Sequence, residues 1–217
     1  LPIVTLVCIT GIDPIKALLS MFRSIRKVEF GAIVLVTTRL TPLNLGKFRI
    51  ERPFNNNLDS IDAYSYYCIY DLYKHIKTKF CLVVQADSWV LNSNVWDDRF
   101  YDYDYIGAPW PLLDDAYIDP FGNHQRVGNG GFSLRSINLL EVPKKTQIEW
   151  NPNGSSFYKH MNANSLSEDG NICVHNRHVF ENQGCKFAPI EIALNFSKEL
   201  PVPEYDGRKT FGFHRYR

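Results

Sequence analysis

The sequence predicts an α/β fold with a mostly parallel central sheet and helices on both faces of that sheet. Two observations support this prediction. First, three continuous apolar runs of strand length lie at residues 3–9, 32–36 and 80–84, and unbroken apolar runs are typical of strands that are buried on both faces. Second, a helical pattern separates each run from the next, which is the order of βαβ units. We therefore expect the first half of the chain to be an α/β unit of the nucleotide-binding kind.

The first predicted strand is followed by a helix with clear start signals. The strand ends at Thr10 and Gly11, and Asp13 can then cap a helix in which Pro14 occupies the first turn. Apolar residues recur at helical spacing through residues 14–25. This segment is therefore predicted to be the first crossover helix.

The second strand leads into a long predicted helix. The strand ends at Thr38 and Arg39, and the polar stretch 55–60 then offers capping groups for the helix. The apolar residues that follow recur with a period near 3.6: Leu58, Ile61, Tyr64, Cys68, Leu72 and Ile76. We expect one continuous helix here, ahead of the third strand.

The second half of the chain has a different rhythm. Aspartates interleave with aromatic residues after Asp87, and Pro and Gly then mark loops. A short strand is predicted at residues 132–134 and a helix at 167–180, with Ser167 as its cap. We therefore expect one domain over 1–217, with a nucleotide-binding half at 1–92 and a mixed, loop-rich acceptor half at 93–217.

Composition limits the partners and the compartment. The formal net charge of +1 provides no long-range field for nucleic acid or an anionic membrane. The five cysteines are scattered and odd in number, which favours reduced thiols and a cytoplasmic location. There is no signal-peptide pattern and no apolar run of membrane-spanning length. Because the chain lacks an initiating Met, we expect it to be a piece of a longer polypeptide.

Asp87 and Ser88 follow the third strand directly. Open α/β sheets bind ligands beyond the carboxyl ends of their strands, and Mg²⁺ and Mn²⁺ combine one or two carboxylates with phosphate oxygens and water. Asp87 is therefore a candidate cation ligand. The alternative is that Asp87 only begins a turn.

A glycine pair precedes the strand at 132–134. The segment Asn129-Gly130-Gly131 lacks the spacing of a dinucleotide or phosphate loop. Adjacent glycines permit positive φ or a close approach of another group. The segment is thus either a tight turn or a place where a ligand meets the main chain.

Glu168 and Asp169 lie at a predicted helix start. A carboxylate there serves as a general base only if burial raises its pKa. The structural alternative is a capping box.

The sequence "FGFHRYR" at residues 211–217 holds His214 between aromatic residues, followed by Arg215 and Arg217. Imidazole can bind a divalent metal, and guanidinium groups pair with phosphate. The alternative is a buried histidine with a basic tail.

A zinc site is not expected. Cys173, His175, His178 and Cys185 match no common ligand spacing, and on a helix Cys173 and His175 point to different faces.

The order of these motifs resembles that of GT-A-fold glycosyltransferases. That family has a DxD-type metal motif, a Gly-rich acceptor loop, an xED motif that supplies the base in many inverting members, and a late metal-binding His. The corresponding residues here are Gln85-Ala86-Asp87 or the shifted Asp87-Ser88, Asn129-Gly130-Gly131, Ser167-Glu168-Asp169 and His214. "YDYIGAPW", "VGNGGFSLRS" and "EDGNIC" are similar to a branch found in bacteria and large algal viruses, including an amino-terminal domain of a multidomain chlorovirus protein that builds capsid glycans.

The resemblance implies a sugar-nucleotide-dependent transferase with Mn²⁺ or Mg²⁺ and a UDP-type donor. The implied metal ligands are Asp87 and His214, and the implied base is Asp169, with inversion at the sugar. Residues implied at the donor are Thr10, Gly11, Thr38, Arg39, Ser88 and Arg215, and residues implied at the glycan acceptor are Trp110, Asn129, Gly130, Gly131 and Glu168. Each donor residue has an alternative role in capping or turn formation. A viral origin would imply the host cytoplasm, and further enzymatic domains in the same polypeptide are expected partners.

One departure leaves two rival functions open. The first acid of DxD is absent, with Gln85 or Ala86 in its place, so Asp87 is the sole carboxylate of the motif. This favours a non-catalytic nucleotide- or carbohydrate-binding module, whereas Glu168, Asp169 and His214 favour an enzyme. A nucleotidyltransferase is the other rival, but no Gly-rich loop with Lys or Arg follows the first strand to hold a triphosphate.

Overall fold

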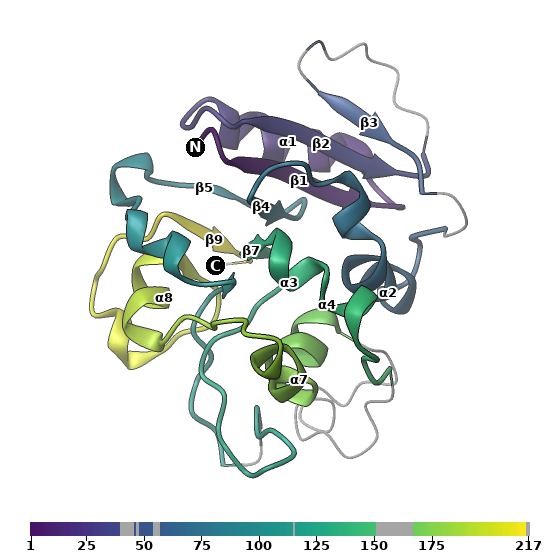
Figure 1. Ribbon diagram of the computed structural model, residues 1–217. Helices are drawn as coiled ribbons and strands as arrows, with labels where there is room; N and C mark the ends of the chain where they lie inside the picture. The colour runs from purple at the N-terminus through teal and green to yellow at the C-terminus, as the bar shows by residue number, and fades with distance from the viewer. Residues whose placement is uncertain (40–45, 47, 54–56, 115, 151–166, 216–217) are drawn as a thin grey trace.

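The computed structural model describes residues 1–217 except 40–45, 47, 54–56, 115, 151–166 and 216–217 (Figure 1). A six-stranded sheet forms its centre, with the strand order β3-β2-β1-β4-β7-β6. Its strands are β1 (Val4–Thr10), β2 (Ala32–Thr37), β3 (Arg49–Glu51), β4 (Phe80–Val84), β6 (Tyr105–Ile106) and β7 (Phe132–Ser136). The first four strands pair in parallel, whereas β7 runs antiparallel to both β4 and β6. The predicted mostly parallel α/β architecture is therefore confirmed.

Helices cover both faces of this sheet. Alternate residues of the central strands belong to two separate apolar clusters, one on each face. Helix α1 (Pro14–Ile25) packs on the face that carries Leu6 and Leu82, and α2 (Ile61–Tyr70) packs on the face that carries Val7 and Val83. Burial on both faces explains why the strands are apolar without interruption.

The predicted caps form at both helices. The Asp13 carboxylate accepts from Lys16 N at the start of α1, and the Ser60 hydroxyl accepts from Ala63 N at the start of α2. The remaining helical segments are η1 (Leu72–His75), η2 (Ser93–Val95), η3 (Asp98–Asp102), α3 (Ile137–Leu140), α4 (Val142–Lys145), α6 (Glu168–Gly170), η4 (Asn171–His175), α7 (Arg177–Asn182), α8 (Ile190–Phe196) and η5 (Pro203–Tyr205).

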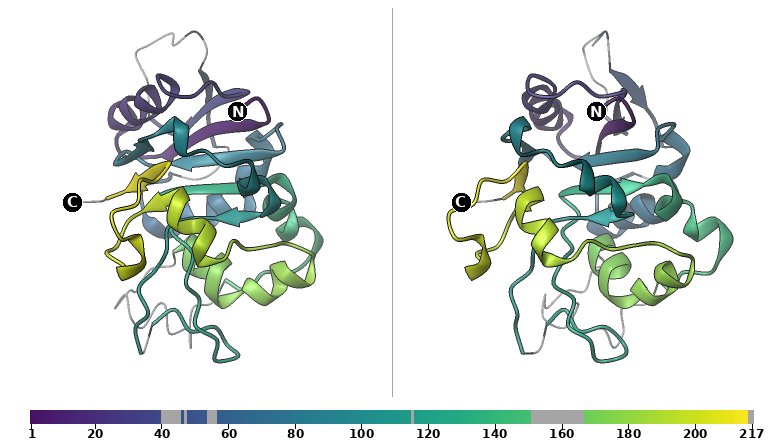
Figure 2. Two further views of the ribbon diagram at one scale, coloured as in Figure 1. Left: turned by 90° about the vertical axis from the view of Figure 1, so that its left-hand side faces the viewer. Right: turned by 60° about the vertical axis from the view of Figure 1, so that its left-hand side comes forward.

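A second, three-stranded sheet lies beside the central one, in the order β5-β9-β8. It consists of β5 (Ser88–Val90), β8 (Ser197–Lys198) and β9 (Gly212–His214). Strand β9 pairs antiparallel with β5 and parallel with β8. Figure 2 shows how this pairing brings the yellow C-terminal segment beside the teal β5. The sheet thus joins segments that lie far apart in the sequence.

Two predicted helices are broken. The expected helix from Leu58 to Ile76 ends at Tyr70, because Asp71 leaves the helical conformation (φ −124°), and a 3₁₀ turn follows. The expected helix at 167–180 divides into α6, a π-turn and α7, with Asn176 (φ −103°, ψ 10°) between the last two. The Asn176 amide donates to the Glu149 carbonyl and to Asn171 Oδ1, and these bonds compete with a regular helix.

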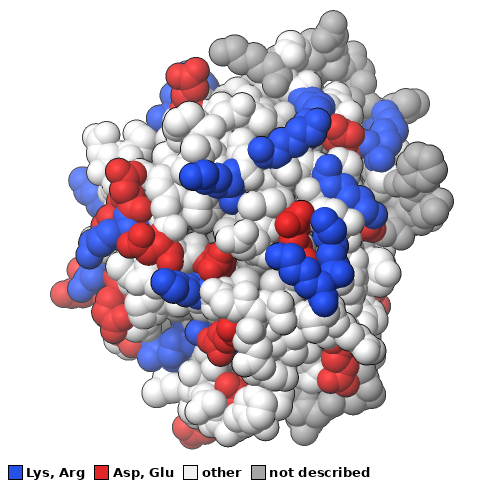
Figure 3. Space-filling model, viewed as in Figure 1, with Lys and Arg blue, Asp and Glu red and all other residues white. Residues whose placement is uncertain are grey.

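The five cysteines are unpaired and buried. Burial raises the pKa of Cys8 and of Cys81 to about 12, so these thiols are unreactive in the fold. On the face drawn in Figure 3, basic and acidic side chains are interspersed, in keeping with the net charge of +1. Within the described part of the chain, no helix is both long and apolar enough to cross a membrane.

Candidate active site

The carboxyl ends of β1, β2 and β4 lie at one edge of the central sheet, since these strands are parallel and adjacent. Residues Thr10 and Gly11 leave β1 there, Thr38 and Arg39 leave β2, and Asp87 lies just beyond β4. This edge is where open α/β sheets bind ligands. The structure therefore brings the predicted donor-side residues to a common edge.

A cavity of about 270 Å³ opens at this edge and is lined by Thr38, Arg39, Asn57 and Asp59. Arg39 Nε donates to the Gly11 carbonyl at 2.8 Å, and the Thr38 hydroxyl donates to the Asn57 carbonyl at 3.0 Å. These bonds connect the loops after β1 and β2 to the segment before α2. Asn57 and Asp59 were not predicted from the sequence, because they lie in a polar stretch that carries no signal beyond helix capping.

The two loop residues after β1 have local structural roles. The Thr10 hydroxyl accepts from the backbone N–H groups of Ile12 and Asp13, each at 3.2 Å. A Cβ at Gly11 would lie 2.2 Å from the Leu58 carbonyl oxygen, so only glycine fits there. Both observations agree with the turn-forming alternative for these residues.

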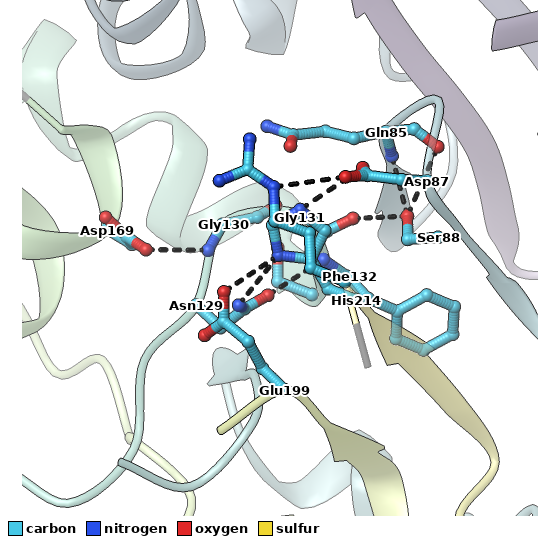
Figure 4. Close-up of polar contacts among 12 residues, drawn as sticks. Gln85, Asp87, Ser88, Asn129, Gly130, Gly131, Phe132, Asp169, Glu199 and His214 are labelled. Carbon is cyan, nitrogen blue, oxygen red and sulfur yellow. Dashed lines mark hydrogen bonds and ion pairs between the residues drawn. The ribbon is translucent and has the colours of Figure 1, made fainter. Parts of the chain in front are cut away.

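Asp87 and His214 face one another across the β5–β9 pairing. The register aligns Ser88 with His214, and the Asp87 side chain then lies with Oδ1 3.3 Å from His214 Nε2 (Figure 4). Arg215 Nε donates to Asp87 Oδ2 at 3.0 Å. Arg215 adopts φ 48°, a left-handed conformation that is uncommon for a non-glycine residue. The second sheet thus assembles a carboxylate, an imidazole and a guanidinium from two distant segments.

Glu199 holds the other side of the imidazole. It follows β8 directly, and its Oε1 lies 3.0 Å from His214 Nδ1. An Nδ1 proton donated to this carboxylate leaves Nε2 directed toward Asp87. Sequence reasoning missed Glu199, because a single acid near a short strand has no pattern that could identify it.

Charge controls the protonation of this cluster. Burial alone would lower the pKa of His214, but Asp87 and Glu199 outweigh burial and raise it to about 9. In turn, the nearby His214 imidazolium and the Arg215 guanidinium lower the pKa of Asp87 to about 2, although burial opposes this shift. The imidazole is therefore a cation at neutral pH unless another cation replaces its Nε2 proton.

The glycine pair lies between the two predicted chemical groups. A Cβ at Gly131 would lie 2.4 Å from the His214 ring, and a Cβ at Gly130 would lie 1.8 Å from Glu168 Oε1. Neither glycine needs positive φ; the left-handed residue is Asn129, at φ 68°. Adjacent glycines are thus required because side chains press against the main chain from both sides.

Asn129 connects the glycine segment to the imidazole. Its Oδ1 accepts from Phe132 N at 3.0 Å, which directs Nδ2 to within 3.0 Å of His214 Nδ1. The Tyr105 hydroxyl donates to the Asn129 carbonyl at 3.0 Å. Asn129 is only 1% exposed, so it packs against the ring and presents no open surface for an acceptor, contrary to the sequence-based expectation.

Ser88 is also placed differently from its expected role at the donor. Its side chain is buried, accepts from Gln85 N at 2.7 Å and donates to the Gly131 carbonyl at 2.5 Å. Both hydrogen bonds hold the glycine segment against the end of β4. Gln85, in the first DxD position, donates from Nε2 to the Tyr64 hydroxyl at 3.1 Å, away from Asp87.

Asp169 lies on the opposite side of the glycine pair from His214 (Figure 4). Its Oδ2 accepts from Gly130 N at 2.9 Å, and its Oδ1 accepts from Gly170 N at 2.8 Å and from the Ser167 hydroxyl. Burial, followed by the negative charge of Glu168, raises the pKa of Asp169 to about 6, against the lowering effect of these hydrogen bonds. A half-buried carboxylate with a pKa near neutrality suits a general base.

The capping-box interpretation of this segment is wrong. Ser167 makes no side-chain cap bond, since its hydroxyl donates to Asp169 instead. Glu168 is 4% exposed and its Oε1 accepts from Arg135 Nη2 at 2.9 Å. The expectation that Glu168 touches an acceptor is therefore corrected: the carboxylate is buried in an ion pair.

Trp110 is not an open stacking platform. It is 2% exposed, and its ring stacks on Tyr117 with centroids 4.6 Å apart and planes 11° apart. The six-membered ring of the indole also lies against Gly128, where a Cβ would be 1.8 Å from the ring. The Trp110 ring, which was expected to stack on a sugar, is therefore packed in the interior.

Two further expectations concern metals and the tail. Across the described residues, no three His, Cys, Asp or Glu side chains are arranged as a metal centre. The expectation that Cys173, His175, His178 and Cys185 form no zinc site stays a prediction. Arg217 lies outside the residues that the structure describes.

Among the solved structures to which the chain is similar, two are of galactosyltransferase LgtC. One is a complex with donor and acceptor sugar analogues, with 13% sequence identity, 97% of this chain and 86% of that chain covered, and a TM-score of 0.49. The other is an active-site mutant of LgtC, with 14% identity, the same coverage of 97% and 86%, and a TM-score of 0.52. The second likeness shows that the fold is GT-A-like, as the sequence predicted.

Sequence comparison gives the family. No curated protein matches the chain. The family model described as "Protein of unknown function (DUF5672)" matches residues 47–214, which include the Asp87, glycine-pair, Asp169 and His214 segments. The chain belongs to this family.

Proposed function

We propose that the protein is a glycosyltransferase that moves a sugar from a nucleotide-sugar donor to a glycan hydroxyl. The observation that carries this proposal is the arrangement around one glycine pair. Gly131 lies against His214, which faces Asp87, while Gly130 N–H binds Asp169. A leaving-group site and a general base are thus held on two sides of the same three-residue segment, at the ligand-binding edge of the sheet.

The Asp87–His214 pair fits a divalent cation. His214 Nε2 is buried and makes no aligned hydrogen bond within the described residues, although it lies 3.3 Å from Asp87 Oδ1. Glu199 on Nδ1 gives the carboxylate–histidine order that commonly orients a metal-binding imidazole. Two protein ligands are enough for Mn²⁺ or Mg²⁺ when diphosphate oxygens and water complete the shell. When bound there, such a cation supplies charge neutralisation for a departing diphosphate.

The residues of the chain divide the reaction between them. Asp169 accepts the proton of the acceptor hydroxyl, and the acceptor oxygen forms a bond to the anomeric carbon. The bond from that carbon to the diphosphate breaks, and the diphosphate leaves with the electron pair. Arg215, beside Asp87, adds positive charge on the leaving side. Attack from the face opposite the leaving group inverts the anomeric carbon. We propose this inverting reaction, with Asp169 as its general base.

The cavity bounded by Thr38, Arg39, Asn57 and Asp59 is the proposed site of the donor's nucleoside. Its polar lining offers both donors and acceptors for a base and a ribose. A UDP-type donor follows from the resemblance to GT-A-fold enzymes. The link to algal-virus capsid glycans, further domains in a longer chain and a cytoplasmic location stay predictions.

A non-catalytic binding module is the second candidate. Gln85 in the first DxD position favours it, since its amide is directed to Tyr64 and leaves Asp87 as the only carboxylate of the motif. Incubation with labelled nucleotide sugars, with and without Mn²⁺, followed by product analysis separates the two. Transfer or hydrolysis of one donor that depends on Asp169 supports the enzyme, whereas saturable donor binding with no turnover supports the module.

A further inference from the structure

A fully buried arginine lies behind the proposed base. Arg135, on β7, is 0% exposed. Its Nη2 donates to Glu168 Oε1 at 2.9 Å and to the Gly130 carbonyl at 3.4 Å, and its Nε donates to the Ser133 hydroxyl at 3.0 Å. Its guanidinium carbon also lies 5.3 Å from the centre of the Tyr105 ring. A buried charge is tolerated only when it is paired, and here the partner is the carboxylate next to Asp169.

Arg135 and Asp169 hold the same peptide group from opposite ends. The N–H of Gly130 donates to Asp169, and the carbonyl of Gly130 accepts from Arg135. Glu168 closes the arrangement, because its Oε1 bonds Arg135 and lies where a Cβ at residue 130 would be. The position of Asp169 is therefore fixed through Gly130 and Glu168 by one arginine.

Two adjacent carboxylates titrate as a coupled pair, and a difference in their surroundings decides which of them takes the proton. Glu168 is paired with the Arg135 guanidinium, whereas Asp169 has no cationic partner among the contacts described above. The other titratable groups that act on Asp169 are Glu199, Tyr105, Tyr117 and Cys173. None of these four carries a positive charge, so Arg135 is the cation that distinguishes the two acids.

We propose that Arg135 is a positioning residue that holds Glu168 in an ion pair and fixes the Gly130 peptide, so that, of the two acids, Asp169 receives the acceptor's proton. The statement rests on the proposed function for its last clause only. Arg135 acts through Glu168 and Gly130 and has no contact with the acceptor.

The test is a carboxyl titration of four proteins by ¹³C NMR: the unaltered chain, Glu168→Gln, Arg135→Met and Arg135→Met/Glu168→Gln. The Asp169 signal is assigned by its loss in Asp169→Asn. The expected order of the Asp169 midpoint is lowest in Glu168→Gln, which keeps the arginine and removes the neighbouring charge, then the double variant, then the unaltered chain near pH 6. Glu168→Gln is expected to move the midpoint by on the order of one pH unit. In Arg135→Met the two carboxyls are expected to titrate as a coupled pair that shares one proton, which they do not do in the unaltered chain.

The double variant guards against misfolding, because it removes both members of the buried pair and leaves no unpaired charge. Arg126→Met is the matched control, since Arg126 pairs with Glu204 at a partly exposed site and its loss is expected to leave the Asp169 midpoint unchanged. The same midpoint in Glu168→Gln, the double variant and the unaltered chain overturns the proposal, whether or not the protein transfers a sugar. The predicted order without transfer of any sugar tested overturns the proposed function and leaves the electrostatic role of Arg135 intact.

Discussion

Gly131 lies directly against the imidazole of His214, so closely that a Cβ at residue 131 would be 2.4 Å from both ring atoms Cε1 and Nε2. The glycine is therefore part of the geometry that sets His214 opposite Asp87. It also binds the Ser88 hydroxyl and Gln85 N through its carbonyl. Main chain and imidazole form one packed unit at this point.

Gly131→Ala is expected to displace the ring and to lower Mn²⁺-dependent binding of UDP at least about tenfold, in the range seen when groups supporting a metal ligand are changed. Calorimetry measures the affinity. The control is Gly207→Ala, where open space surrounds a left-handed backbone (φ 70°). That change costs stability through backbone strain alone, and UDP binding equal to that of Gly131→Ala would refute the role assigned to Gly131.

Asp169→Asn is expected to lower kcat by about 10²- to 10⁴-fold, the usual contribution of a general base, with donor binding retained. In the unaltered chain, kcat/KM is expected to fall as the pH drops through about 6, because Asp169 must be deprotonated to accept a proton. A pH–rate profile measures both effects. The exposed Asp102→Asn serves as the control and should leave the profile unchanged; an acid limb that persists in Asp169→Asn with normal turnover would assign the base elsewhere.

Glu199→Gln is expected to reduce Mn²⁺ affinity by about 10- to 100-fold, since an outer carboxylate raises the basicity of a ligating imidazole and fixes its tautomer. Electron paramagnetic resonance of free Mn²⁺ measures the affinity. Glu191→Gln, an exposed change on α8, is the matched control. Equal affinities in the two variants would show that Glu199 does not support His214.

The ion pairs of His214 predict a pH dependence of stability. The pKa of His214 is raised from its ordinary 6.5 to about 9 in the fold, so its contribution is fully present below pH 6.5 and is lost as the pH rises through about 9. We expect the Tm to fall over that interval by more in the unaltered chain than in His214→Asn. Parallel melting curves of the two proteins would contradict the assigned charge.

The fold was predictable where local pattern and burial agree. Apolar runs identified β1, β2 and β4, and Asp13 with Pro14 identified the start of α1. The break at Asn176 was not predictable, because it depends on a tertiary hydrogen bond to the Glu149 carbonyl. The break at Asp71 was not predictable either, because no local pattern marks it. The strands β8 and β9 are two and three residues long, too short for a periodic signal.

The candidate site shows the same division. Asp87 follows β4 and His214 ends β9, and their residue types indicated metal binding. That the two side chains meet depends on the β5–β9 register, which the sequence does not reveal. Glu199 had no pattern at all. Arg135 could have been found, since a charge inside a doubly buried strand requires a buried partner, but the predicted strand ended one residue before it. Trp110 and Glu168 were assigned to an acceptor by the family resemblance, and packing placed both in the interior.

The most direct measurement is the position of Mn²⁺ in crystals grown with UDP, located by anomalous scattering. We expect one manganese peak in contact with an Asp87 carboxylate oxygen and His214 Nε2 and shared with the diphosphate. The same crystals of His214→Ala are expected to lose that peak. A peak bound to other side chains, or ordered UDP diphosphate beside Asp87 with no metal between them, would contradict the proposed cation site.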